Sequence, residues 1–251
     1  MSKIADLVAN RRFAIGTLVS SPCPLTAEAI SLSGIDFMFI DTEHAPIAIT
    51  NATTMIQSVA GRCLSFIRTS DSGPTSIKQA LDTGCDGIIV PQVNSSAIAR
   101  KVSAAAKYPP LGTRSVGISR AHGFGKTFST YIESANRDVS LFVQIEHISA
   151  VDDIEAICRV SGVEGIFIGA NDLSGSLGKP GQVNDIEVQN AISRAIDVAL
   201  REGRLVGAFA ATDLMAKALV TKGVNVIAVG TTLARLMSAC ESTVTTLRNP
   251  A

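Results

Sequence analysis

Residues 142–172 read FVQIEHISAVDDIEAICRVSGVEGIFIGAND, and this stretch holds two short apolar runs separated by a helical pattern. The runs are Phe142–Glu146 and Phe167–Asp172, and each ends in a carboxylate. Side chains along a strand alternate between its two faces, so Gln144 and Glu146 face the same way. A carboxylate at the end of a buried strand is costly unless something pairs with it. The stretch therefore predicts two buried strands joined by a helix, and it suggests a cation shared by Glu146 and Asp172.

The same alternation of apolar strands and helical patterns continues along the whole chain. Each strand is a nearly continuous apolar run, as expected when both faces of a sheet are covered. Eight strand–helix units in 251 residues match the size of a closed (β/α)₈ barrel, the TIM barrel. An open doubly wound sheet would also alternate, but the first strand lacks a GxGxxG turn. The predicted strands are Phe13–Ser20, Phe37–Glu43, Cys63–Ser70, Gly87–Val93, Leu141–His147, Gly165–Asp172, Leu205–Thr212 and Val224–Thr231, and the predicted helices include Thr26–Leu32, Ala48–Ala60, Ser76–Thr83, Ser96–Lys107, Ala150–Val160 and Val188–Arg201.

The composition allows one large domain and excludes several classes of protein. Of the residues, 46% are hydrophobic and 18% are charged, enough to bury one substantial core, so we expect residues 1–251 to form one barrel domain. The formal net charge is zero and no basic run is present, so nothing favours a nucleic acid as partner. The five cysteines are scattered without CxxC spacing, which is typical of free thiols in a reducing compartment. Because no signal-peptide pattern or membrane-spanning run is present either, we expect a cytoplasmic protein.

Polar and charged side chains gather at the carboxyl ends of the predicted strands, where the reacting groups of such a barrel lie. A carboxylate beside His44 would orient its ring for acid–base work. The fork of Arg68 suits a carboxylate or a developing enolate. Glu146 and Asp172 would share a divalent cation such as Mg²⁺, which prefers oxygen ligands. The whole set is Asp41, Glu43, His44, Arg68, Gln144, Glu146 and Asp172.

Each of these residues also has a purely structural interpretation. His44 could cap a loop, Arg68 could pair with a neighbouring acid, and Gln144 could be a satisfied amide of the core. His122 and His147 have no comparable company, and we assign them no catalytic role. The lysines all fall in helical or loop contexts, which argues against imine chemistry, and no cysteine ends a strand. A metal-assisted mechanism remains.

The longest connection without a clear strand is Lys107–Asn136, which begins Tyr-Pro-Pro-Leu-Gly-Thr-Arg114. Long loops in compact domains are usually functional or form interfaces. Arg114 is therefore a surface charge, a subunit contact or a substrate clamp. With Arg120 and His122 it could bind carboxylate or hydroxyl groups of a substrate at the mouth of the barrel.

Several motifs, in order from about Phe13 to Leu247, resemble those of the HpcH/HpaI aldolase family. Members are class II, metal-dependent aldolases that reversibly cleave 4-hydroxy-2-oxo acids to pyruvate and an aldehyde. The resemblance implies a barrel of the phosphoenolpyruvate/pyruvate-domain type that uses Mg²⁺, Mn²⁺ or Co²⁺. It also implies a homo-hexamer, a trimer of dimers that exchange their last helix. The motifs are Asp41-Thr-Glu-His44-Ala-Pro, Arg68, Ile77-Lys-Gln-Ala-Leu-Asp82-Thr-Gly, Val90-Pro-Gln-Val, Pro109-Pro-Leu-Gly-Thr-Arg114, Gln144-Ile-Glu146 and Gly169-Ala-Asn-Asp172-Leu-Ser.

The resemblance assigns roles residue by residue. Glu146 and Asp172 would be the metal ligands, and Arg68 would bind the pyruvate oxygens and stabilise the enolate. His44 with Asp41 would form the acid–base pair, and Gln144 would line the pyruvate pocket. Asp82 matches an acid that reaches a neighbouring subunit's site, although a charge at a helix end explains it nearly as well. Asn171 stands in the turn whose amides hold the pyruvate carboxylate, where the family usually has Pro-Ala or Pro-Ser.

Two other functions stay open at this point. A lyase acting on citramalyl- or malyl-CoA resembles this family in barrel and metal site, but it needs a basic patch for the CoA phosphates, and only Arg114, Arg120 and Lys126 offer one. A barrel without catalysis could instead serve as an assembly protein. For the aldolase, we expect a short aldehyde partner that is acidic or hydroxylated, such as the fragment of a 2-keto-3-deoxy sugar acid or of a 4-hydroxy-2-oxo dicarboxylate.

Overall fold

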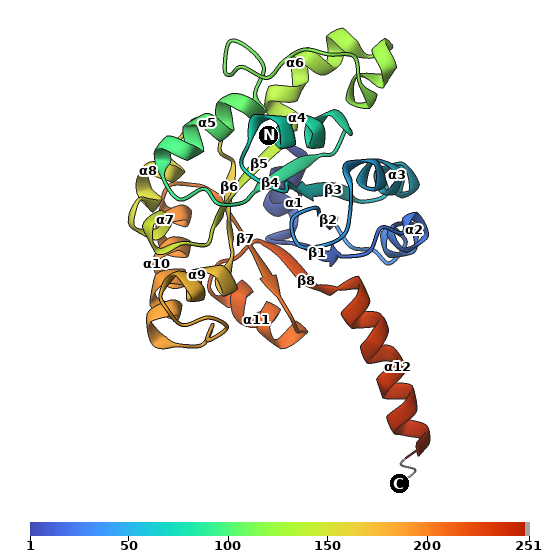
Figure 1. Cartoon of the computed structure of the whole chain (residues 1–251), viewed down its shortest axis with the longest axis vertical. Helices are drawn as coiled ribbons and strands as arrows, with labels where there is room; N and C mark the ends of the chain where they lie inside the picture. The colour runs from blue at the N-terminus through green and yellow to red at the C-terminus, as the bar shows by residue number, and fades with distance from the viewer. Residues whose placement is uncertain (249–251) are drawn as a thin grey trace.

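The computed structural model describes residues 1–248, so residues 249–251 of the expected domain lie outside it. Eight parallel strands pair in chain order, and the last pairs with the first to close the sheet (Figure 1). The predicted (β/α)₈ TIM barrel is confirmed. The strands are β1 (Ala14–Val19), β2 (Phe37–Asp41), β3 (Leu64–Arg68), β4 (Gly87–Val90), β5 (Ser140–Ile145), β6 (Gly165–Ile168), β7 (Leu205–Ala210) and β8 (Val226–Thr231).

The inside of the barrel is packed by phenylalanine rings that sit over glycines of the neighbouring strand. Phe167 of β6, for example, pairs with Gly207 of β7. A methyl group added to any of the four glycines concerned would come within 2.6 Å of the facing ring. Large rings therefore fill the narrow interior only because each neighbour carries no side chain. The four pairs are Phe37 with Gly16, Phe66 with Gly87, Phe142 with Gly165 and Phe167 with Gly207.

Helices surround the barrel, and several of them were not predicted. The segment expected as one helix, Ala150–Val160, consists of two short helices that meet at Asp153. The long connection Lys107–Asn136 is largely helical toward its end, where the sequence predicted a loop. None of the helices within residues 1–248 has the length and apolarity needed to cross a lipid bilayer. The helices are α1 (Lys3–Arg11), α2 (Pro24–Ser31), α3 (Ile49–Val59), α4 (Pro74–Asp82), α5 (Ser96–Ala106), η1 (a 3₁₀ helix, Arg120–Gly125), α6 (Phe128–Asp138), α7 (Ile148–Asp152), α8 (Ile154–Cys158), α9 (Ala170–Ser176), α10 (Ile186–Arg201), α11 (Asp213–Thr221) and α12 (Thr232–Arg248).

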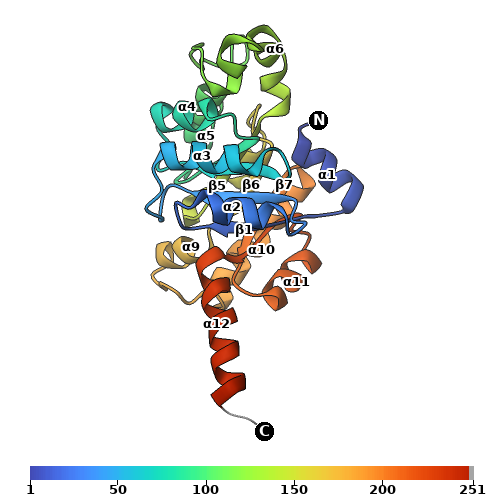
Figure 2. The same ribbon diagram turned by 90° about the vertical axis from the view of Figure 1, so that its right-hand side faces the viewer.

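The two terminal helices behave differently. Helix α1 closes the amino end of the barrel, because Ile4 packs into the interior cluster and Lys3 pairs with Asp86, just before β4, at 2.7 Å. Helix α12 instead projects away from the barrel (Figures 1 and 2). Its side chains are almost all exposed, among them Leu236 and Leu247. The wall beside it is exposed too, and Ile15 of β1 is 43% accessible.

Candidate active site

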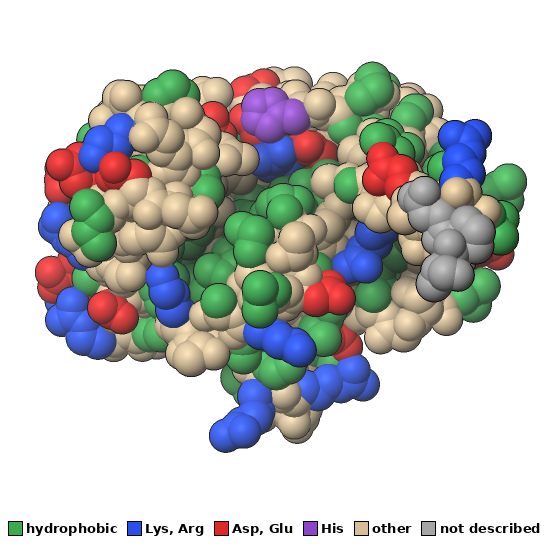
Figure 3. Space-filling view, turned by 90° about the horizontal axis from the view of Figure 1, so that it is seen from below, with side chains coloured by type: hydrophobic (Ala, Val, Ile, Leu, Met, Phe, Trp, Pro, Cys, Tyr) green, Lys and Arg blue, Asp and Glu red, His purple; other side chains and the backbone are tan. Residues whose placement is uncertain are grey.

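Two adjoining cavities lie at the carboxyl ends of the strands. The larger, of about 420 Å³, is lined by Phe39, Asp41, Arg68, Gln144, Asn171 and Phe209 among others. The smaller, of about 300 Å³, is lined by Glu43, Gln92, Asn94, Glu146, His147 and Ser176 among others. His44 and Asp172 line both. Figure 3 shows a hollowed face of the molecule where a histidine stands beside acidic and basic side chains. All the predicted strand-end residues therefore lie around one opening.

Arg68 and Asp41 form a two-pronged ion pair at the bottom of the opening. Arg68 follows the inward parity of Phe66, and Asp41 follows that of Phe39, so neighbouring strands bring the two side chains together. Nε of Arg68 donates to Oδ1 of Asp41 at 2.9 Å, and Nη2 donates to Oδ2 at 2.7 Å. Burial alone would raise the pKa of Asp41, but Arg68 and two backbone N–H groups hold that pKa below its ordinary value. Asp41 is therefore an ionised group whose oxygens are occupied.

The ring of His44 does not contact Asp41, although the sequence led us to expect a pair. Oδ1 of Asp41 accepts from the backbone N–H of His44 at 3.2 Å and from that of Glu43 at 3.0 Å. The His44 side chain is 62% exposed, and its Nε2 lies 3.8 Å from Oε2 of Glu43. The backbone N–H groups of this turn thus donate to Asp41, while the imidazole of His44 lies closer to Glu43. Burial raises the pKa of Glu43, against the opposing charge of Arg68.

Gln144 and Glu146 continue the inward face of β5, as their parity predicted. Oε1 of Gln144 lies 3.4 Å from Nη1 of Arg68, and Nε2 of Gln144 donates to Oε2 of Glu146. The other oxygen of Glu146 accepts the backbone N–H of Gln92, a residue with a φ of +58° in the turn after β4. Sequence reasoning gave Gln92 and Asn94 no role. Their place at the carboxyl end of β4 could have indicated that they lie near the site.

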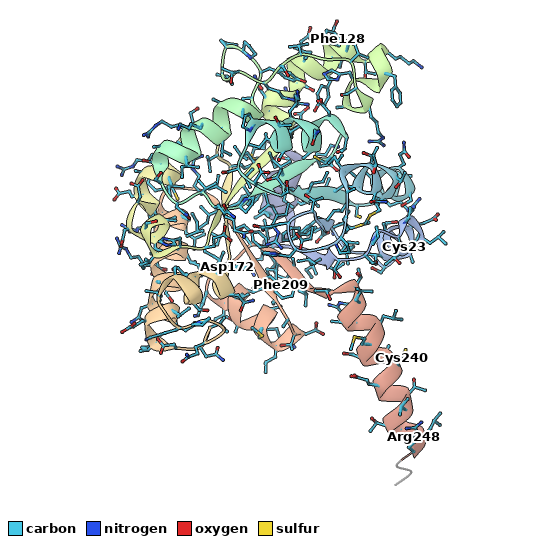
Figure 4. The ribbon with its side chains drawn as sticks, in the orientation of Figure 1. Cys23, Phe128, Asp172, Phe209, Cys240 and Arg248 are labelled. Carbon is cyan, nitrogen blue, oxygen red and sulfur yellow. The ribbon has the colours of Figure 1, made fainter. Side chains whose placement is uncertain are left out.

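Asp172 reaches the opening from a helix, not from a strand. The predicted strand Gly165–Asp172 is too long, because β6 ends at Ile168 and α9 begins at Ala170. Gly169 makes the turn possible, since a Cβ there would lie 2.7 Å from Cβ of Glu146. Asp172 in the first turn of α9 and Phe209 on β7, both labelled in Figure 4, line the same cavity.

Asp82 and the loop around Arg114 lie elsewhere in this chain. Asp82 ends α4 and pairs with Nη2 of Arg114 at 3.0 Å. Arg114 is buried against Tyr108 and Tyr131, and Arg120 donates to the backbone oxygen of Thr83 at 2.6 Å. The expectation that this loop lines the mouth is wrong for the single chain, because Arg114, Arg120 and His122 contact the end of α4 or α6 and line neither cavity.

Comparison with known proteins places the chain in a family. The sequence profile of the HpcH/HpaI aldolase/citrate lyase family matches residues 15–239. A 2-keto-3-deoxy-L-rhamnonate aldolase of Klebsiella pneumoniae is 36% identical over 219 residues, which cover 86% of this chain and 82% of that protein.

Solved structures agree with this placement. An HpcH/HpaI aldolase/citrate lyase family protein of Burkholderia cenocepacia superposes with a TM-score of 0.91 at 28% identity, covering 94% of this chain and 95% of the other. An HpcH/HpaI aldolase of Desulfitobacterium hafniense gives a TM-score of 0.89 at 26% identity, covering 100% and 98%. The predicted aldolase function, as a carbon–carbon lyase, is confirmed together with the fold. The chain belongs to the HpcH/HpaI aldolase/citrate lyase family.

Proposed function

We propose that this enzyme is a divalent-metal-dependent aldolase that reversibly cleaves a 2-keto-3-deoxy sugar acid to pyruvate and an aldehyde. The observation that carries the proposal is the Arg68–Asp41 pair, which opens into the same cavity as Gln144 and Asp172. A fixed positive charge, beside carboxylates that can hold a divalent cation, suits the enolate formed when the C3–C4 bond breaks. The name of the Klebsiella relative supports a sugar acid as the substrate class.

The residues at the opening fit a divalent cation. The Glu146 carboxylate accepts two hydrogen bonds and keeps further lone pairs, and no hydrogen bond from residues 1–248 reaches the side chain of Asp172. Glu146 and Asp172 would therefore hold Mg²⁺, Mn²⁺ or Co²⁺ together with waters and substrate. When bound, the ion supplies Lewis-acid polarisation of the keto oxygen.

Arg68 supplies charge to the developing enolate oxygen. Asp41 fixes two of its five N–H donors, and the remaining donors face the cavity beside Gln144. A preorganised donor of this kind contributes about 3 kcal/mol to the transition state. The N–H groups of residues 170–172 begin α9 without helical partners, so they are free to bind the carboxylate of pyruvate beside Asn171.

His44 is the group proposed to move the proton. In the cleavage direction its ring takes the proton of the C4 hydroxyl, and in the synthetic direction it returns that proton to the new alkoxide. Asp41 acts indirectly, because both of its oxygens already accept hydrogen bonds. A CoA-ester lyase finds less support, since Arg114 and Arg120 are tied into the protein. Asp82 is left with the role that the resemblance implies, in a neighbouring subunit's site.

We further propose that α12 is exchanged between the subunits of a dimer, and that three dimers form a hexamer. Support comes from the projecting helix and from an apolar groove of about 690 Å³ at its base, lined by Ile15, Leu25, Ile30, Leu233 and Leu236 among others. Covering this groove removes apolar surface from water. The free cysteines support a cytoplasmic location, where thiols stay reduced.

A coupled assay tests the proposed function. Purified enzyme is incubated with 2-keto-3-deoxy sugar acids and with 4-hydroxy-2-oxo dicarboxylates, and lactate dehydrogenase reports pyruvate. We expect activity with the sugar acids that disappears in EDTA and returns with Mn²⁺, Co²⁺ or Mg²⁺. Full activity in EDTA, or trapping of a pyruvate imine by borohydride, would refute the metal mechanism. Light scattering at decreasing protein concentration tests the hexamer.

A further inference from the structure

Two residues that line the smaller cavity each carry a buried polar atom without a hydrogen-bond partner in the described part of the chain. Among residues 1–248, five buried side-chain atoms lack a hydrogen-bond partner, and two of them are Oε2 of Glu43 and Oδ1 of Asn94. Both residues line the cavity of about 300 Å³ beside Glu146 and Asp172. Buried polar atoms without partners are rare, and an ion or ordered water commonly accounts for them.

Arg68 pairs with Glu43 by charge, but no neighbouring group of the described residues donates a hydrogen bond to Oε2 of Glu43. Its side chain is only 9% exposed, and Nε of Arg68 lies 3.2 Å from Oε2. That nitrogen carries a single hydrogen, which is directed to Oδ1 of Asp41 at 2.9 Å. Nε2 of His44, at 3.8 Å, is beyond hydrogen-bond distance. A buried carboxylate oxygen, in a residue that lines the cavity, is therefore left without a hydrogen-bond donor from the part of the chain that the structure describes.

The chemistry of the cavity wall favours donors carried by a cation. Besides the Glu43 and Asn94 oxygens, the wall presents the Glu146 and Asp172 carboxylates, with the exposed imidazoles of His44 and His147 at its edge. So many acceptors would repel an anionic substrate. The waters of a hydrated Mg²⁺ or Mn²⁺ ion are strong donors, and these ions keep several of them in proteins. The cavity has room for such waters, each of which takes about 30 Å³.

We propose that this smaller cavity holds the water shell of the bound cation, and that Glu43 and Asn94 accept hydrogen bonds from its waters. The proposal rests on the proposed metal-dependent function and adds two residues that touch neither the ion nor the substrate. They act as positioning residues, because they fix the waters and through them the face of the ion left open. The larger cavity is then the one that remains for the organic substrate.

The affinity for Mn²⁺, measured on the purified enzyme by electron paramagnetic resonance without substrate, tests the proposal. Glu43→Gln is expected to raise the Kd for Mn²⁺ about 10- to 100-fold, as outer-shell changes do. Asn94→Leu and Asn94→Ala, which remove no charge, are expected to raise it about three- to tenfold, the value of one neutral hydrogen bond. Glu155→Gln removes an exposed carboxylate and should leave the Kd unchanged.

The possible outcomes distinguish failure of the outer-shell proposal from failure of the proposed metal site. Wild-type Kd values in Glu43→Gln and in both Asn94 variants would overturn the outer-shell proposal alone. A change in Glu43→Gln without one in the Asn94 variants would also overturn it, because that result reports only charge. Absence of Mn²⁺ binding by the wild-type enzyme would instead refute the metal site itself. Circular dichroism of each variant confirms that the affinities belong to folded protein.

Discussion

Two arginine–aspartate pairs, each with a largely buried arginine, have similar contacts and different surroundings. Arg68 and Asp41 stand at the barrel mouth, where the arginine side chain is 11% exposed. Arg114 and Asp82 join the segment before α6 to α4, and the Arg114 side chain is 1% exposed. Arg114 lies over the ring of Tyr108, 4.5 Å from its centre, and donates to the Tyr131 hydroxyl at 3.3 Å. An ion pair alone is therefore no sign of a site.

The two arginines differ in whether their remaining N–H donors face a cavity. Arg114 is enclosed by aromatic rings and an acid, so its charge holds two segments together. Arg68 keeps unused N–H donors toward a cavity that carboxylates and an amide also line. The first pair is expected to matter for stability and the second for chemistry. Substitutions at the two pairs test whether one pair serves stability and the other serves catalysis.

The largest effect is expected from Arg68→Ala. Loss of the fixed charge should lower kcat about 10²- to 10³-fold, because the enolate oxygen loses its donor. The exchange of pyruvate methyl protons in deuterated water, followed by NMR, isolates this half of the reaction. The affinity for Mn²⁺ should change little, since Arg68 is no ligand. A wild-type exchange rate would show that Arg68 is structural and that the two pairs are alike.

Arg114→Met should act mainly on stability. The change removes the ion pair with the partly exposed Asp82, the contact with the Tyr108 ring and the hydrogen bond to Tyr131, a loss of about 2 kcal/mol. Urea unfolding measures the loss. A free energy of unfolding equal to that of the wild type would contradict the structural role.

The aspartates sharpen the comparison. Asp41→Asn should lower kcat about 10²-fold, because a displaced Arg68 no longer meets the substrate in the productive geometry. Asp82→Asn should cost about 1 kcal/mol of stability, since Asp82 is partly exposed and the amide oxygen of Asn can still accept from Arg114. A loss of kcat in Asp82→Asn as large as in Asp41→Asn would mean that Asp82 works in a neighbouring subunit's site. Steady-state kinetics at saturating metal distinguishes these results.

The smallest expected effect is a pH dependence of stability that comes from His122, which packs beside Tyr108 and Arg114. His122 is fully buried, with Nε2 at 3.0 Å from the Tyr108 hydroxyl, and burial lowers its pKa. Because the unfolded chain protonates this histidine near pH 6.5 and the folded chain only at lower pH, stability is complete above about pH 6.5 and falls below it. The slope is at most about 1.4 kcal/mol per pH unit. Thermal unfolding from pH 7.5 to 5.5 should show a smaller slope in His122→Asn, and an unchanged slope would contradict it.

The positions that the sequence could predict are those fixed by strand parity. Asp41, Arg68, Gln144 and Glu146 lie two residues apart from core residues on the same face, so alternation alone directs them into the barrel. Asp172 was predicted near the right place but on the wrong element, because strand ends depend on a turn that only the packing of Gly169 against Glu146 explains.

Contacts between distant segments escaped prediction. The Arg114 loop was expected at the mouth, but its course depends on aromatic rings of Tyr108 and Tyr131 that no local pattern connects. The orientation of the His44 ring depends on which carboxylate its own turn leaves free. Such choices are made by side-chain geometry after the chain has folded.

The phenylalanine rings that pack on glycines restrict the register in which neighbouring strands of the barrel can pair. If β7 slipped by one residue against β6, its inward side chains would turn outward. If it slipped by two, the Phe167 ring would meet Leu205 or Phe209 in place of Gly207, and no space would remain. Each ring is thus compatible with one strand register, and the adjacent registers are excluded by steric clash or by exposure of core side chains. A designer who enlarges a glycine must shrink the facing ring in the same step, since neither position can change alone.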